Sequence, residues 1–255
     1  MTRSVVVVLL GALAPASVFA IDGQVLINQS TVMAQGGFPY VISNPGSYKL
    51  SGNLQAKDKD TDVIRINTDN VTIDMNGFSI LGSANCSVFP CTNEGFGRGI
   101  ASDPSRRTTN VTIRNGTIQG MGGSAIDVNG DNSLVEYMHI RDNGNSGIQL
   151  TEGIVQKNNV DRNDGHGITI STGVITDNKA TRNAIDGINC NLTGTISRNV
   201  VFFNRRFGIG SSGNNAGVNA IGNAIAGNFV AQLGSTVLNQ GQNVCNGSSC
   251  PGPVF

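Results

Sequence analysis

The chain has 255 residues, only 13% of them charged, and a formal net charge of zero at pH 7. It therefore lacks the excess positive charge that draws proteins to nucleic acid or to anionic membranes, and neither is expected as a partner. Its 34 glycines would be typical of disorder if no apolar pattern accompanied them, but a regular apolar pattern is present and predicts a folded chain.

The first 20 residues, 1–20, have the features of a secretory signal peptide. Arg3 is followed by an apolar run from Val5 to Leu13 and then by Val18-Phe19-Ala20, a small-residue cleavage sequence. The run is too short to cross a bilayer as a helix, which takes about 20 apolar residues, and no later stretch approaches that length. The protein is therefore expected to be secreted or periplasmic, with no transmembrane segment, and residues 21–255 to form its folded domain.

Three alternating aspartates, Asp58, Asp60 and Asp62, follow residues 21–53, which are expected to cap the N-terminal end of the domain. In a loop, these carboxylates would converge and supply oxygen ligands to a calcium ion, Ca2+. In a strand, they would only share the face exposed to water. The glycine and the closing glutamate of an EF-hand loop are missing, and the sequence leaves both interpretations open.

The segment 82–99 interrupts a pattern that is otherwise repeated. Before it stands Val71-Thr72-Ile73-Asp74-Met75-Asn76-Gly77, and after it the similar Val111-Thr112-Ile113-Arg114-Asn115-Gly116. The interruption is therefore predicted to be a protruding loop, and loops on rigid scaffolds often carry function. Its notable side chains are Cys86, Phe89, Cys91, Glu94, Phe96 and Arg98.

From about Asn110 to Asn228 the chain repeats itself every 20 residues or so. Gly147-Ile148-Gln149-Leu150 returns as Gly167-Ile168-Thr169-Ile170 and as Gly187-Ile188-Asn189-Cys190. Three apolar columns align down the repeats, and each lies in a short segment rich in β-branched residues. The columns are Ile113, Val135, Val155, Ile175, Ile196; Ile118, Ile140, Val160, Ala180, Val201; and Ile126, Ile148, Ile168, Ile188, Ile209.

This repeat predicts an all-β solenoid, a single-stranded parallel β-helix with about 20 residues and three short strands in each coil. Side chains alternate along a strand, so Ile148 and Leu150 are expected in the core and Gln149 in water. Cys190 shares the core position of Leu150 and is expected to be a buried thiol, not a nucleophile. Asparagines recur in pairs five residues apart, such as Asn158 with Asn163, and are expected to form structural ladders at two turns of every coil.

Two pairs of cysteines lie close together in the sequence. In an oxidising compartment, Cys86 with Cys91 and Cys245 with Cys250 are expected to form local disulfides. Metal binding is the alternative, but no histidine lies near either pair. Residues 231–255, which contain the second pair, are expected to cap the C-terminal end, because an uncovered last coil would expose core and strand edges.

The chain resembles a known superfamily in its coil pattern and in the lead-in Tyr40-Val41-Ile42-Ser43-Asn44-Pro45-Gly46. It is similar to secreted bacterial right-handed parallel β-helix repeat proteins of the pectin-lyase-like superfamily. That resemblance implies a right-handed coil, but the superfamily contains lyases, hydrolases, epimerases and adhesins, so it does not imply one activity. Two motifs, Asn67-Thr68-Asp69 and Gly165-His166-Gly167, resemble those of polygalacturonases, but the paired aspartates expected between them are absent.

Candidate site residues come from the outward column beside the third apolar column: Ala101, Asp127, Gln149, Thr169 and Asn189. Polyuronate lyases of this superfamily use arginine or lysine as a base, which implies a catalytic cluster of Arg98, Asp127 and Glu94. Arg106, Arg107, Gln149 and Phe96 are the expected substrate-binding residues. The alternative is that these side chains form an ordinary solvated face, and His166 is expected on an exposed turn.

Two functions follow from these observations. The first is binding or processing of a polysaccharide, such as a cell-surface glycan, on the outer face, with a lyase favoured over a hydrolase if the protein is an enzyme. The second is a non-catalytic structural or adhesive role at the cell surface or in the periplasm, which the low charge and the uniform turns favour. The only cofactor that the sequence indicates is Ca2+ at Asp58, Asp60 and Asp62.

Overall fold

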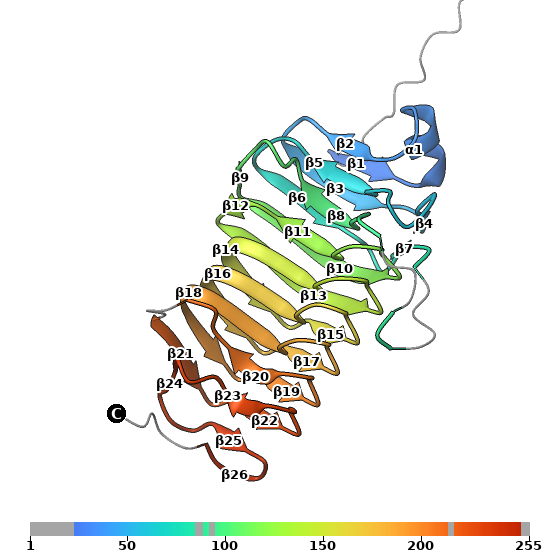
Figure 1. Cartoon of the computed structure of the whole chain (residues 1–255). Helices are drawn as coiled ribbons and strands as arrows, with labels where there is room; N and C mark the ends of the chain where they lie inside the picture. Colours follow the sequence, from blue (N-terminus) through green and yellow to red (C-terminus); the bar gives the residue numbers. More distant parts are fainter. Residues whose placement is uncertain (1–22, 85–88, 92–94, 214–216, 251–255) are drawn as a thin grey trace, which may run out of the picture.

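The structure is a computed structural model that describes residues 23–84, 89–91, 95–213 and 217–250. The described chain winds into a rod of stacked coils, in which strands pair in parallel with the coils before and after them (Figure 1). In the middle of the rod the paired residues are 20 positions apart, as in Ile148 with Ile168. The prediction of an all-β parallel β-helix is therefore confirmed.

The strands form three stacks, here called stacks A, B and C, and the longer strands bend from one stack into the next. Stack A contains β1 (Gln24–Ile27), β3 (Gly46–Leu50), β6 (Val71–Asp74), β10 (Val111–Gln119), β13 (Ser133–Arg141), β14 (Ile148–Gln156), β16 (Ile168–Thr176), β18 (Ile188–Ser197), β21 (Gly217–Ile221) and β24 (Val237–Asn239). Stack B contains β4 (Leu54–Gln55), β7 (Ser79–Leu81), the ends of β10 and β13, β15 (Asn159–Asp161), β17 (Lys179–Thr181), β19 (Val200–Phe202), β22 (Ala224–Ala226) and β25 (Val244–Cys245). Stack C contains β2 (Tyr40–Ile42), β5 (Ile64–Ile66), β8 (Ile100–Ser102), β11 (Ile126–Val128), the starts of β14, β16 and β18, β20 (Phe207–Gly210) and β23 (Ala231–Leu233).

The core follows the three predicted apolar columns. Strand pairing places Ile113, Ile118 and Ile126 in register with their counterparts in the next coil, Val135, Ile140 and Ile148. All fifteen residues of the columns are buried. Cys190 is also buried, and burial raises the pKa of its thiol to about 11. The core prediction, including the burial of the Cys190 thiol, is confirmed.

Asparagine side chains form two ladders along the inside of the turns. Asn178 Oδ1 accepts hydrogen bonds from the backbone N and from Nδ2 of Asn158, at 2.9 and 3.0 Å. Asn183 Oδ1 accepts the same two bonds from Asn163. The ladder asparagines are buried, and they satisfy turn N–H groups that no strand reaches. The predicted ladders are therefore confirmed.

The residue before a ladder asparagine adopts left-handed backbone geometry, as Lys157 (φ 56°), Asp177 (φ 58°) and Arg198 (φ 55°) do. Such geometry costs roughly 1–2 kcal/mol for a residue with a side chain. The ladder hydrogen bonds offset this cost, because they form only when the turn has that shape. The bend from stack C to stack A instead needs glycine: at Gly173 (φ 145°) a Cβ would lie 2.0 Å from the carbonyl oxygen of Gly153.

Both ends of the rod contain coil strands. β1, β2 and β3 lie within residues 21–53, so coil stacking begins inside the segment expected to be a cap. Helix α1 (Gln29–Ala34) is capped by Asn28 and lies at this end of the rod (Figure 1). At the other end, β23, β24 and β25 continue the coils into residues 231–255. There β25 pairs antiparallel with β26 (Ser248–Ser249), and the Cys245–Cys250 disulfide joins this hairpin, as predicted.

The described parts of the segment 82–99 lie against the coils. Backbone N–H groups of Gly95 and Gly97 donate to the carbonyl oxygens of Gly122 and Lys59. Cys91 N donates to Asp164 Oδ2 at 2.6 Å, three coils further along the rod. The protruding loop of the prediction is therefore, where described, a strap along the turns. Cys91 is disulfide-bonded, whereas Cys86, its expected partner, lies outside the described residues.

The remaining pair of strands, β9 (Thr108–Thr109) and β12 (Gly130–Asp131), forms a small separate sheet at the turn before stack A. Within the described part of the chain, no helix combines the length and the apolar character that a membrane crossing requires. The signal peptide predicted for residues 1–20 lies outside the described residues.

Candidate functional site

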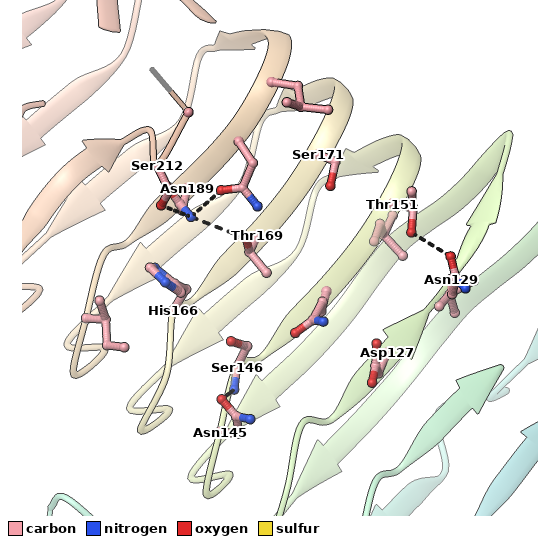
Figure 2. A pocket seen from close by; sticks show the side chains of 17 residues that line it. Asp127, Asn129, Asn145, Ser146, Thr151, His166, Thr169, Ser171, Asn189 and Ser212 are labelled. Carbon is pink, nitrogen blue, oxygen red and sulfur yellow. Dashed lines mark hydrogen bonds between the residues drawn. The ribbon is translucent and has the colours of Figure 1, made fainter. Parts of the chain in front are cut away.

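A groove of about 840 Å³ follows the outer face of stack C (Figure 2). Its floor is the predicted outward column, because Asp127, Gln149, Thr169 and Asn189 are paired in register on β11, β14, β16 and β18. With coils about 4.8 Å apart, these four residues extend over about 14 Å of the axis. The other polar lining residues are Asn129, Asn145, Ser146, Thr151, His166, Ser171, Asn191 and Ser212.

Amides and hydroxyls of the groove bond to one another toward both of its ends. Asn189 Nδ2 lies 2.8 Å from Asn191 Oδ1 and 3.2 Å from Ser212 Oγ. Thr151 Oγ1 donates to Asn129 Oδ1 at 3.0 Å. Such bonds hold the side chains in fixed positions while leaving some donors and acceptors free to face the groove. Gln149 is exposed in the middle of the groove and makes no side-chain hydrogen bond to any described residue.

His166 lies at the edge of the groove, where the turn between stacks B and C ends. Its Nδ1 is 3.4 Å from Asp186 Oδ2, in the next coil. Asp186 is fully buried and also accepts hydrogen bonds from Arg206 Nε and Nη2, at 2.7 and 2.6 Å. Burial raises the pKa of Asp186, but the adjacent His166 imidazole and the hydrogen bonds from Arg206 and the Phe207 N–H outweigh this effect and leave the pKa below its ordinary value.

The exposed turn predicted for His166 is therefore wrong. Ser146 and Asp186, its equivalents in the neighbouring coils, are buried, and the His166 side chain is itself only 20% exposed. The His166 side chain lies against Asp186 of the next coil, and Asp186 is in turn covered by Arg206 of the coil after that. His139, by contrast, is exposed on stack B.

Arg98 closes the N-terminal end of the groove by linking Asp127 to Asp62. Its Nη1 lies 3.0 Å from Asp127 Oδ2, and its Nη2 lies 2.9 Å from Asp62 Oδ2. The hydrogen bonds that Arg98 donates to Asp62 are the largest cause that raises the pKa of Arg98, followed by the bond that it donates to Asp127, against the opposing effect of burial. Asp62 is desolvated too, yet its bonds to Arg98 and Arg65 lower its pKa.

A family model described as "Right handed beta helix region" matches residues 76–250. The chain belongs to this right-handed β-helix family. The right-handed coil expected from the resemblance is thereby shown. No curated protein sequence matches the chain.

Solved structures with similar folds include the A-modules of two mannuronan C-5 epimerases of Azotobacter vinelandii. The AlgE4 module has a TM-score of 0.45 and 15% identity over 86% of this chain and 82% of that one. The AlgE6 module has a TM-score of 0.41 and 14% identity over 85% and 80%. The Dettilon tailspike protein (gp208) has a TM-score of 0.37 and 11% identity over 85% and 57%.

The β-helix brings together two members of the expected catalytic cluster, Arg98 and Asp127. The third, Glu94, lies outside the described residues. The raised pKa of Arg98 and its two carboxylate partners keep the guanidinium charged, which opposes the role of a proton-accepting base. The groove lining retains Asp127 and His166 as groups able to transfer protons, but two coils separate them, or about 10 Å of backbone along the axis.

Arg106 and Arg107, which were expected to bind substrate, are engaged elsewhere. Arg106 Nη2 lies 2.8 Å from Asp69, and Arg107 forms an ion pair with Asp131 beside the small β9–β12 sheet. Neither residue lines the groove. Of the other expected substrate-binding residues, Gln149 lies in the groove, and Phe96 lines a separate hollow at its N-terminal end.

The calcium site expected at Asp58, Asp60 and Asp62 is not formed. Asp58 accepts hydrogen bonds from Asp60 N and Thr61 Oγ1, and Asp60 accepts one from Phe96 N. Asp62 is directed to Arg98 and Arg65 instead. Across the described residues, no three His, Cys, Asp or Glu side chains are arranged to hold a metal ion. Local turn bonds and arginine pairs direct the three carboxylates to different partners, so they do not converge as the calcium interpretation requires.

Sequence reasoning missed the edges of the groove, Asn129, Asn145 and Ser212, and the pairing of His166 with Asp186. A signal for the pairing is present in the sequence, since His166 and Asp186 occupy the same repeat position in consecutive coils. Residues at one repeat position stack in space, so a basic and an acidic residue in succession predict a contact.

Proposed function

We propose that this β-helix protein binds a neutral polysaccharide chain lengthwise in the groove of stack C. The observation that carries the proposal is the lining: a groove of about 840 Å³ whose polar side chains are nearly all amides and hydroxyls. Hydroxyl-rich sugars need many hydrogen-bond donors and acceptors of this kind, placed at fixed positions. The strand register supplies one such side chain in each of three consecutive coils, namely Gln149, Thr169 and Asn189.

The charge of the lining supports a neutral ligand over a uronate polymer. Among the described lining residues, Asp127 and His166 are the only titratable ones, and neither lysine nor arginine is present. A polymer with one carboxylate on each sugar would have to place several charges in the groove without cationic partners, which is costly. Asp127 adds a charge of the same sign, although Arg98 neutralises it.

Export is part of the proposal. The Cys245–Cys250 disulfide is typical of oxidising compartments, and residues 1–20 have the sequence of a signal peptide. A polymer-binding groove is useful where polysaccharides are found, outside the cytoplasm. We therefore place the protein in the periplasm or outside the cell.

The test is retention of the purified protein on a panel of immobilised neutral and uronate polysaccharides, at physiological salt and with EDTA present. The proposal expects retention on at least one neutral polymer, and release by its soluble oligosaccharides. Retention on uronate polymers alone would contradict it. Absence of retention on every polymer of the panel would also contradict the proposal and would favour the structural or adhesive role.

A further inference from the structure

We infer that the hollow beyond the N-terminal end of the groove is an aromatic subsite, which binds one further sugar ring of the same chain against Phe96. This inference rests on the proposed function and extends it. The hollow has a volume of about 470 Å³ and is called the Phe96 subsite below. Its lining residues are Phe38, Pro39, Asp60, Thr61, Asp62, Arg65, Phe96 and Arg98.

Phe96 is presented to solvent by a fixed backbone. The residue is 85% exposed, yet its backbone N–H donates a hydrogen bond to Asp60 Oδ1 at 3.0 Å. On either side, Gly95 N donates to Gly122 O, and Gly97 N donates to Lys59 O, at 3.0 and 2.9 Å. A Cβ at Gly95 or Gly97 would lie 2.5 Å from a backbone oxygen. Close backbone packing therefore holds an exposed phenylalanine in place, as a ligand platform requires.

The polar side of the Phe96 subsite is balanced in charge. Arg65 and Arg98 face Asp62 at 3.0 and 2.9 Å, and Asp60 lies at the rim. The subsite thus offers both donors and acceptors but little net charge. Arg65 Nε is buried without a hydrogen-bond partner among the described residues. A flat apolar ring beside paired donors and acceptors fits a pyranose, which has an apolar face and an edge of hydroxyls.

The Phe96 subsite adjoins the N-terminal end of the groove, and the Arg98–Asp127 ion pair lies between them. Arg65, Ala101, Asp127 and Gln149 follow one another in register along the outer face of stack C. Arg98 lines the subsite, Asp127 lines the groove, and the two side chains are bonded at 3.0 Å. A polymer lying over Gln149 and Asp127 therefore meets Phe96 next. Short oligosaccharides that fill the groove alone do not reach it.

The experiment measures dissociation constants by calorimetry for neutral oligosaccharides of increasing length, using the polymer that retains the wild-type protein. Phe96→Ala is expected to weaken binding of the longer oligosaccharides by roughly two- to tenfold, the range of one aromatic contact. Phe96→Trp should retain their affinity. Short oligosaccharides should bind all three proteins equally, and thermal unfolding should be unchanged because Phe96 is exposed.

Phe229→Ala is the matched control, because Phe229 is also highly exposed (87%) and lies near the C-terminal end of the rod, away from the subsite. Equal affinity of wild type and Phe96→Ala at every length would overturn the inference and leave the proposed function standing. A loss in Phe96→Ala that is the same for short and long oligosaccharides would also overturn it. If no neutral oligosaccharide binds the wild-type protein, both the inference and the proposed function are contradicted.

Discussion

Replacing Asn178 by alanine tests whether the asparagine ladders stabilise the rod. The Asn178 side chain accepts from the backbone N and Nδ2 of Asn158, and donates to Val155 O, Thr176 O and Asn199 Oδ1. These five bonds are buried, since Asn178 is 2% exposed. A buried hydrogen bond contributes about 1 kcal/mol net, and an orphaned donor costs more. We expect Asn178→Ala to lower the free energy of unfolding by about 3–5 kcal/mol.

The measurement is urea unfolding followed by far-ultraviolet circular dichroism. Lys179→Ala is the matched control, because Lys179 is the next residue, is exposed on β17 and makes no side-chain hydrogen bond to a described residue. A surface substitution of this kind changes stability by about 0.5 kcal/mol or less. Equal effects of the two substitutions would refute the reasoning, because the ladder would then contribute nothing beyond its surface area.

Three further predictions concern backbone, charge and thiol. Gly173→Ala should destabilise more than Gly46→Ala in the same urea assay, because both have a positive φ (145° and 148°) but only a Cβ at Gly173 meets a carbonyl oxygen, at 2.0 Å. Arg206→Met should cost about 1–3 kcal/mol at pH 7, since it removes the main cationic partner of buried Asp186 from a partly exposed ion pair. Because the folded pKa of Asp186 lies below its ordinary value of 3.8, the stabilisation is present above that pH and is lost as the pH falls through the lowered folded pKa. The difference between variant and wild type should therefore shrink as the pH falls below about 4, and a constant difference would contradict this. Cys190, with its pKa raised to about 11, should not react with Ellman's reagent until the chain is unfolded, and reaction in the native state would contradict its burial.

The core was predictable because its signal is a strict period. In the middle coils the paired residues are 20 positions apart, so Ile148, Ile168 and Ile188 align by inspection. The N-terminal coils have the same architecture, but their paired residues are unevenly spaced in the sequence: Gln24 pairs with Ser47, Ser47 with Thr72, and Thr72 with Thr112. Insertions between these strands, above all the segment 82–99, change the spacing without changing the stacking. For this reason the predicted caps contain coil strands.

The site was only partly predictable, for a different reason. Strand alternation places Asp127 and Gln149 on the outer face, and the structure confirms both positions. Alternation does not say how deeply a turn is covered by the next coil, so the burial of Asp186 beneath Arg206 was missed. It also does not give the direction of a carboxylate in a loop, and Asp58 and Asp62 point to different partners, whereas the calcium interpretation required them to converge.

The most direct test of the account is the affinity of the groove for a neutral oligosaccharide in two amide variants. Gln149→Ala removes an exposed amide from the middle of the groove, and Asn159→Ala removes an outward amide from the neighbouring stack B. The Gln149→Ala variant loses one or two hydrogen bonds to the ligand, so its affinity should be about two- to thirtyfold lower than that of the wild type. The Asn159→Ala variant should bind with wild-type affinity. Wild-type affinity in Gln149→Ala, or an equal loss in both variants, would show that the polysaccharide does not lie in the groove of stack C.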